Sequence, residues 1–294
     1  MSTPPKSATP RKKAAVTGDT LAGVTQCVAF IGGGNMASAI IGGLVKQGLP
    51  GDQIDVVEPV AEARERLARH YGVRCSAQPG EALQRSELVV WAVKPQTFKD
   101  AALQSRFFTR NALHLSVAAG IRSDSIAHWL GTERVVRAMP NTPSLIGKGM
   151  TALFARAGVT SDDQRLVAKV IATTGEHLWV AQEAQLDAVT ALSGSGPAYV
   201  FYFIEAMTQA GAEMGLSLEQ AKRLAVGTFI GAGELARESN EPPEILRQRV
   251  TSKGGTTYAA ITSMEQDDIK GRFMKALKAA QVRAKELGDE FGDA

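Results

Sequence analysis

Residues 251–257 combine two adjacent glycines with four hydroxyl side chains and one lysine, in the order Thr-Ser-Lys-Gly-Gly-Thr-Thr. Gly254 and Gly255 allow the backbone to turn through positive φ, and the sequence after Tyr258 is typical of a helix. Backbone N–H groups at a helix N-terminus bind small anions. The segment is therefore either an anion site or a plain helix cap with a glycine-rich turn, and taken alone it favours the cap.

A second glycine-rich segment, 32–37, could bind a dinucleotide. It follows directly after Cys27–Ile31, an apolar run with the length of a buried strand, and a helical pattern comes next. The order Gly-Gly-Gly-Asn-Met-Ala fits the G-x-G-x-x-A fingerprint. In that fingerprint Gly32 makes the tight turn, Gly34 admits the pyrophosphate, and Ala37 allows close packing of helix on strand.

The expected second strand, 53–57, is followed by Glu58, which lies 26 residues after Gly32. An acidic residue at roughly this place binds the adenosine ribose hydroxyls. A carboxylate there would repel a 2′-phosphate, whereas Arg64 and Arg66 on the next helix either counter that repulsion or simply face solvent. Both interpretations stay open, so NADPH and NADH are both candidate cofactors.

The elements that must position these segments alternate between strand and helix up to about residue 182. Further expected strands are 88–93, 113–117, 135–139, 149–154 and 177–180. Such alternation with short links predicts a doubly wound sheet. Lys94-Pro95-Gln96 follows one of these strands, at the sheet edge where ligands of open α/β sheets bind. We therefore expect a dinucleotide-binding Rossmann domain over residues 25–182.

Residues 183–294 show helical patterns only. Ser193-Gly-Ser-Gly-Pro197 interrupts a long helical stretch, and proline there predicts a kink or a break. Ser217-Leu-Glu-Gln220 has the form of a capping box. The broad apolar faces of these helices exceed what about 110 residues can bury alone, so we expect an all-helical domain that forms a homodimer.

Composition bounds the remaining possibilities. The chain has 294 residues, 44% hydrophobic and 21% charged, which is globular and long enough for two domains. A net charge of +3 without a basic stripe argues against nucleic acid, and no apolar run reaches membrane-spanning length. Scattered histidines and the separated Cys27 and Cys75 predict no metal site and a reduced, cytoplasmic protein.

Residues 1–24 are rich in Pro, Ser, Lys and Arg and predict a disordered tail.

Several segments match one family together. They are Phe30-Ile-Gly-Gly-Gly-Asn-Met36, Ala92-Val-Lys-Pro95, Ser116-Val-Ala-Ala-Gly120, Arg137-Ala-Met-Pro-Asn-Thr-Pro143, Leu192-Ser-Gly-Ser-Gly-Pro-Ala-Tyr199 and Val250-Thr-Ser-Lys-Gly-Gly-Thr-Thr257. In this order they resemble the pyrroline-5-carboxylate reductases, which make proline, over about residues 26–285. The last segment is the family's own signature, whereas many dehydrogenases share the first.

The resemblance implies a Rossmann domain, a helical dimerisation domain, and often a larger ring of dimers. It places the active site between the nucleotide domain and helices of both subunits. The reaction it implies is NAD(P)H-dependent reduction of the cyclic imine 1-pyrroline-5-carboxylate to L-proline. Direct hydride addition to a protonated C=N bond needs positioning rather than a catalytic triad or a metal.

Roles follow from the resemblance by position. The cofactor-binding residues it implies are Ile31, Gly32, Gly33, Gly34, Asn35, Met36, Ala37, Glu58, Val93, Lys94 and Ala118. The substrate-binding residues it implies are Ser252, Gly254, Gly255, Thr256, Thr257 and Glu183. Thr257 is also the implied catalytic residue, because its hydroxyl can hydrogen-bond the ring nitrogen while the loop's N–H groups hold the carboxylate.

Two departures from the family pattern stand out. Lys253 replaces the usual proline of the loop and is either a solvated charge or an added attraction for the substrate carboxylate. Pro79 aligns with a position where many members carry an asparagine near the adenosine ribose. Tyr199 likewise has two possible roles, as a proton donor or as an aromatic residue of the core.

Two rival functions are weaker. A hydroxyacid dehydrogenase of the helical-domain type starts with a similar glycine turn, but it carries a lysine where this chain has Ser-Gly-Ser-Gly-Pro. A paralogue that binds the cofactor without catalysis is disfavoured by the intact Gly-Gly-Thr-Thr of 254–257.

Overall fold

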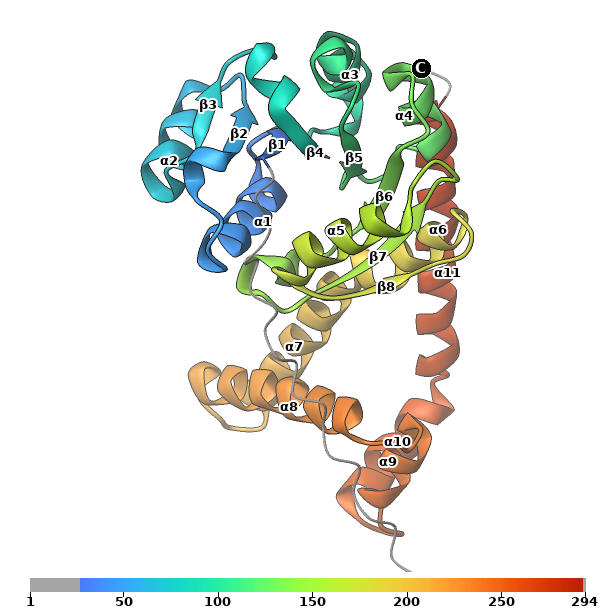
Figure 1. The fold of residues 1–294 in the computed structure, drawn as a ribbon. Coiled ribbons are helices and arrows are strands. Elements are labelled where there is room, and N and C mark those ends of the chain that lie inside the picture. Colours follow the sequence, from blue (N-terminus) through green and yellow to red (C-terminus); the bar gives the residue numbers. More distant parts are fainter. Residues whose placement is uncertain (1–26, 293–294) are drawn as a thin grey trace, which may run out of the picture.

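The computed structural model describes residues 27–292, and the tail expected over 1–24 lies outside them. The first part of the chain forms a sheet covered by helices. The last part is helical, and its helices within residues 196–266 (α7 to α10) extend away from the sheet (Figure 1). None of the helices within 27–292 is long and apolar enough to cross a membrane.

A single sheet of eight strands carries the first domain, in the order β3-β2-β1-β4-β5-β6-β7-β8. The strands are β1 (Cys27–Ile31), β2 (Ile54–Val57), β3 (Arg74–Ser76), β4 (Ser86–Trp91), β5 (Leu113–Ser116), β6 (Val135–Met139), β7 (Gly149–Ala155) and β8 (Gly175–Trp179). Pairing is parallel from β3 through β6, β7 runs antiparallel to β6, and β8 is parallel to β7. The strand order reverses between β1 and β4, which is where ligands of such sheets bind.

All the strands expected from the sequence occur, and their ends differ from the expectation by two residues at most. The sequence did not predict β3. The strand consists of Arg74, Cys75 and Ser76, and a segment this short and polar has no recognisable pattern. Pairing with β2 makes this segment a strand, which is a tertiary effect.

Alternate residues of the strands fill two cores, one on each face of the sheet. Phe30 of β1 joins the core with Ile40 of α1 (Asn35–Lys46). Its neighbour Ile31 joins the opposite core with Phe98 of α3 (Pro95–Thr109). The helices of this domain are α1 (Asn35–Lys46), α2 (Ala61–Tyr71), α3 (Pro95–Thr109), α4 (Ser123–Leu130) and α5 (Ser161–Ala172). This arrangement is the expected doubly wound Rossmann domain.

The second domain consists of helices. They are α6 (Gln185–Val189), α7 (Gly196–Glu213), α8 (Leu218–Glu238), α9 (Pro243–Arg249), α10 (Thr256–Gln266) and α11 (Ile269–Gly292). The expected break is a π-helical turn over Thr190–Gly194, after which Pro197 sits in the first turn of α7. Proline is tolerated there because its missing N–H would have had no partner within the helix. The expected capping box is also present, since Gln220 N donates to Ser217 Oγ and Ser217 N donates to Gln220 Oε1.

The helical domain has almost no core within one chain. Among the described residues of α7 to α10, the buried ones are Gly211, Ala221 and Ala225, where α7 crosses α8. Large apolar side chains face outward instead, including Phe201 at 64% and Leu235 at 69% exposed. Contiguous apolar surface of this extent marks a protein–protein interface.

The last helix links the two ends of the molecule. From α10, α11 runs back to α4 and ends beside it at Gly292 (Figure 1). Near that end Phe291 lies 3.2 Å from the point that a Cβ of Gly120 would occupy, and Arg122 pairs with Asp289 at 2.5 Å. The loop after β5 is therefore in contact with the helical domain.

Candidate functional site

The glycine-rich loop after β1 is fixed between its neighbouring strands. Gly32 N donates to Val57 O at 2.8 Å, and Ala92 N donates to Ile31 O at 2.8 Å. Gly32 has φ +97°, and a Cβ there would lie 2.6 Å from Ala92 O. Both the backbone conformation and the close approach of Ala92, the residue after β4, require glycine at this position.

The next part of the loop leaves room for a phosphate. Gly34 is exposed, and no heavy atom lies within 4 Å of the place where its Cβ would be. Helix α1 begins at Asn35 with no side-chain cap and no acidic residue in its first turn. Uncapped N–H groups and the helix dipole attract an anion, so this cradle fits the pyrophosphate of a dinucleotide.

Glu58 lies beside this loop at the end of β2. Its Oε2 accepts a hydrogen bond from Gly33 N at 2.8 Å, and its Oε1 accepts one from Val60 N at 2.9 Å. Arg64 reaches back to the same corner, where its Nη1 donates to Glu58 O at 2.8 Å and to Pro59 O at 2.7 Å.

The other expected cofactor residues lie along the same sheet edge. Val93 follows β4, and its Cγ1 is 3.1 Å from the point that a Cβ of Gly32 would occupy. Lys94 is exposed just before α3, and Ala118 is buried after β5, where its N–H donates to Ser116 Oγ at 3.3 Å. Because β1, β4 and β5 are parallel neighbours, their carboxyl ends bring these residues together.

The loop before α10 has the backbone expected from its glycines. Gly254 has φ +76°, and a Cβ on Gly255 would lie 2.7 Å from Ser252 Oγ. Gly255 N donates to Ser252 O at 3.0 Å, which closes the turn. Helix α10 then begins at Thr256 with no side-chain cap and no acidic residue in its first turn. The side chain of Lys253 is exposed, and Thr257 is half-buried.

One chain does not bring the two loops together. The glycine loop lies at the edge of the sheet, whereas α9 and α10, with the loop between them, lie at the far end of the helical domain (Figure 1). A site that uses both loops therefore needs a second copy of the chain or a large rearrangement.

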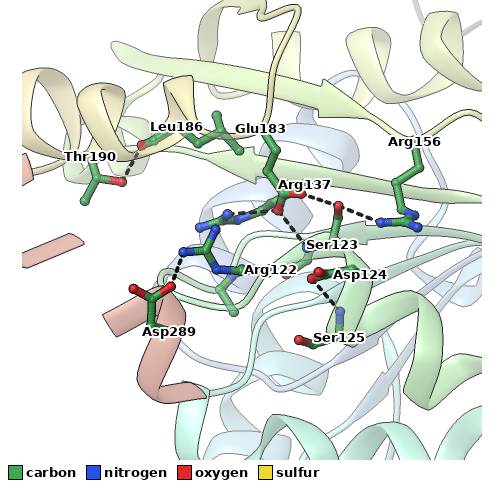
Figure 2. Close-up of polar contacts among 12 residues, drawn as sticks. Arg122, Ser123, Asp124, Ser125, Arg137, Arg156, Glu183, Leu186, Thr190 and Asp289 are labelled. Atoms are coloured by element: carbon green, nitrogen blue, oxygen red, sulfur yellow. Dashed lines mark hydrogen bonds and ion pairs between the residues drawn. The ribbon is translucent and has the colours of Figure 1, made fainter. Parts of the chain in front are cut away.

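Glu183 is found away from the α10 loop, at the start of the helical domain. Its carboxylate accepts from Ser123 N at 2.6 Å, from Ser123 Oγ at 2.5 Å and from Arg137 Nη1 at 3.0 Å. Arg156 Nη1 adds a hydrogen bond to Ser123 Oγ at 3.2 Å, as Figure 2 shows. These contacts join β6, the residue that follows β7, α4 and the segment before α6.

Ser123, Arg137 and Arg156 were not singled out from the sequence. One indication was present, because Arg137 stands inside the apolar run Val-Val-Arg-Ala-Met and is only 4% exposed. A charged residue at a buried strand position needs a partner of opposite charge. The sequence does not say which of 30 acidic residues it is.

The Ser193–Tyr199 segment packs closely on its surroundings. A Cβ on Gly194 would lie 2.4 Å from Met139 Cε, and Asn141 Nδ2 donates to Ser193 O at 3.1 Å. The ring of Tyr199 meets Phe273 edge-on at 5.8 Å and lines an apolar cavity of about 580 Å³. Small residues here permit a tight helix–strand crossing, which supports a packing role for the segment.

Two family models match the chain. The model described as pyrroline-5-carboxylate reductase dimerisation matches residues 183–287, and the one described as NADP oxidoreductase coenzyme F420-dependent matches residues 27–120. The pyrroline-5-carboxylate reductase of Pseudomonas aeruginosa is 43% identical over 271 residues, covering 91% of this chain and 99% of the relative. The enzyme of that name from Arabidopsis thaliana is 37% identical over 262 residues, covering 88% and 95%.

Solved structures agree with these matches. A pyrroline-5-carboxylate reductase from Coxiella burnetii superposes with a TM-score of 0.84 at 38% identity, covering 90% of this chain and 98% of that one. The Plasmodium falciparum pyrroline carboxylate reductase with NADP bound superposes with a TM-score of 0.80 at 28% identity, covering 90% and 98%.

Proposed function

The chain belongs to the pyrroline-5-carboxylate reductase family of NAD(P)-dependent oxidoreductases, and from that premise we propose how its residues divide the work. The reaction reduces the C=N bond of 1-pyrroline-5-carboxylate to give L-proline in proline biosynthesis. The observation that carries the assignment of roles is the glycine-lined, uncapped N-terminus of α10. Such an end holds a carboxylate without needing a charged side chain.

The cofactor half of the site comes from the sheet edge. We propose that Ile31 to Ala37 hold the pyrophosphate at the start of α1, and that Glu58 faces the adenosine ribose. Val93, Lys94 and Ala118 flank the nicotinamide side, because they follow the carboxyl ends of the neighbouring strands β4 and β5. The nicotinamide, when bound, supplies the hydride.

The substrate half comes from the α10 loop. Ser252, Gly254 and Thr256 present backbone N–H groups or a hydroxyl to the substrate carboxylate. Gly255, whose N–H closes the turn on Ser252 O, lets the carboxylate approach the backbone closely. The hydroxyl of Thr257 in the first turn of α10 holds the ring nitrogen, which orients the C=N carbon. Because a protonated imine is already electrophilic, the residues act by orienting the substrate and excluding water.

Glu183 fits this scheme differently from its expected role. Its carboxylate already accepts hydrogen bonds from Ser123 and Arg137. We therefore propose that Glu183 positions the start of α4, just after the loop that holds Ala118, and does not contact the substrate.

A second copy of the chain completes the site in this proposal. The α10 loop of one subunit would meet the sheet edge of the other, since one chain keeps them apart (Figure 1). Support comes from the exposed apolar faces of α7 and α8 and from the dimerisation family matched over 183–287. Association into rings of dimers in the cytoplasm, and a division into 25–182 and 183–294, are part of the same proposal.

An absorbance assay with the full chain tests the function directly. Adding 1-pyrroline-5-carboxylate to the enzyme with NADPH or NADH should cause loss of the reduced-nicotinamide band and formation of an equal amount of L-proline. Binding of a dinucleotide without any oxidation would instead favour the cofactor-binding paralogue. Oxidation with a hydroxyacid's keto partner, and none with the imine, would favour the dehydrogenase.

A further inference from the structure

At the end of β2 the cofactor site has one acidic side chain, Glu58, and one basic side chain, Arg64. The first would repel the 2′-phosphate of NADPH, and the second would attract it. We propose that Glu58 makes this enzyme prefer NADH over NADPH. The inference rests on the proposed cofactor site. It deepens that proposal by choosing between the two dinucleotides, which the sequence left open.

The carboxylate of Glu58 is held in place on two sides. Gly33 N donates to one oxygen at 2.8 Å and Val60 N to the other at 2.9 Å. Its stem also packs closely, because a Cβ on Gly33 would lie 3.2 Å from Glu58 Cγ. The side chain therefore belongs to the structure of the glycine loop and is not free to swing aside for a phosphate.

The position of this carboxylate favours hydroxyls. Strand β2 is the neighbour of β1, so the end of β2 is the place where an acidic residue accepts hydrogen bonds from the ribose of NAD. Each oxygen of Glu58 accepts one bond from the protein and keeps a further lone pair. A 2′-phosphate has no proton to donate at neutral pH and would bring negative charge against negative charge.

Arg64 is directed at the backbone. Its Nη1 donates to the carbonyl oxygens of Glu58 and Pro59, at 2.8 and 2.7 Å, which uses both hydrogens of that nitrogen. These bonds brace the turn after β2, and they fix the guanidinium on the backbone side of the carboxylate.

Arg66 is placed elsewhere. It lines a shallow hollow on the surface of α2 together with Glu62, Glu65 and Arg69. Two carboxylates, Glu62 and Glu65, line the same hollow. Because Arg64 uses Nη1 on backbone carbonyls and Arg66 lies in the hollow on α2, we expect the charge of Glu58 to decide the preference.

Calorimetry can measure the equilibrium binding of NADH and of NADPH to the full chain. This measurement tests the inference without relying on turnover. Wild-type enzyme should bind NADH at least about tenfold more tightly than NADPH. Glu58→Gln removes the charge but keeps an oxygen for Gly33 N. This variant should bind NADH more weakly and NADPH more tightly than the wild type does, so that the ratio of the two Kd values shifts by about tenfold or more.

Two further variants test whether the charge at position 58, rather than the net charge of the protein, sets the preference. Glu58→Asp keeps the charge and should keep the preference for NADH. Glu62→Gln makes the same change of net charge on the exposed side of α2, and it should leave the Kd ratio unchanged.

The outcomes separate the two proposals. Equal weakening of both cofactors in Glu58→Gln would show that Glu58 only braces the glycine loop, and it would overturn the inference. Tighter binding of NADPH to the wild type would also overturn it, with the proposed function intact. A wild type that binds neither dinucleotide would overturn the proposed function itself.

Discussion

The carboxylate of Glu183 accepts two hydrogen bonds from Ser123, one from its backbone N at 2.6 Å and one from its Oγ at 2.5 Å. Ser123 is the first residue of α4, so Glu183 neutralises the positive end of that helix (Figure 2). Since Glu183 opens the helical domain and α4 belongs to the sheet domain, this pair joins the two. Arg122, one residue earlier, joins the same loop to Asp289 of α11.

Loss of the Glu183 carboxylate should destabilise the protein. Glu183→Ala leaves the buried guanidinium of Arg137 without its carboxylate, and breaking such a pair costs about 3 kcal/mol. Urea unfolding monitored by fluorescence measures this loss. Glu176→Ala is the matched control, because Glu176 makes a solvent-exposed pair with Arg237 at 3.5 Å, and its loss should change stability far less.

The same variant distinguishes positioning from substrate binding. A Glu183→Ala protein with wild-type stability and a strongly raised KM for the imine would mean that Glu183 contacts the substrate, contrary to the role proposed above.

Removing the hydroxyl of Thr257 should impair catalysis. Thr257→Ala deletes one hydrogen bond to a charged ring nitrogen, and such a bond is worth about 1.5–3 kcal/mol, so kcat/KM should fall about tenfold or more. Steady-state kinetics with the imine measures the change. Ser263→Ala, which removes an exposed hydroxyl later in α10, should stay close to wild type. Equal kcat/KM for Thr257→Ala and wild type would remove Thr257 from the site.

Disrupting the apolar helical face should abolish activity together with association. Leu235→Glu puts a charge on α8 in an apolar groove of about 630 Å³. Sedimentation should show the wild type as a dimer or larger species at micromolar concentration and this variant as a monomer without turnover. Phe107→Glu is the control, since Phe107 is similarly exposed, at 67%, but lies on α3 of the sheet domain. A fully active monomer would contradict a site shared between subunits.

Acid should destabilise the fold through His114. Burial lowers the pKa of this imidazole to about 3, and its Nδ1 accepts a hydrogen bond from Trp91 Nε1 at 3.1 Å. In the unfolded chain the pKa of histidine is about 6.5, so between these two values the unfolded state binds the proton and the folded state does not. The contribution of His114 to stability is therefore complete above pH 6.5 and is lost as the pH falls toward 3.

Urea unfolding at a fixed protein concentration and at several pH values from 7 to 4 measures this effect. Below pH 6.5 the free energy of unfolding should fall by about 1.4 kcal/mol per pH unit from this residue. His114→Gln keeps an acceptor for Trp91 and should lose that part of the slope. His128→Gln, on the exposed side of α4, should retain it, and identical slopes in both variants would exclude His114 as the cause.

Local features were predictable because their causes lie within a few residues. Gly32 and Gly254 have the positive φ expected of them, and Ser217 caps α8 with Gln220 as the partner. The break before Pro197 is also a local effect, because proline lacks the N–H that would hydrogen-bond within the adjacent helical turn. Strand β3 was missed because pairing with β2 holds it, and its own sequence does not.

The sequence by itself determined the two glycine loops, the Rossmann order that follows the first and the helices that carry the second. These depend on backbone rules and on apolar periodicity, which act along the chain. Only the tertiary structure decided which carboxylate Arg137 meets, because Ser123, Arg137 and Glu183 come from separate segments that fold together. It also decided that the α10 loop lies away from the cofactor edge of its own chain, since α7 and α8 carry their apolar faces outward and leave them for another surface to cover.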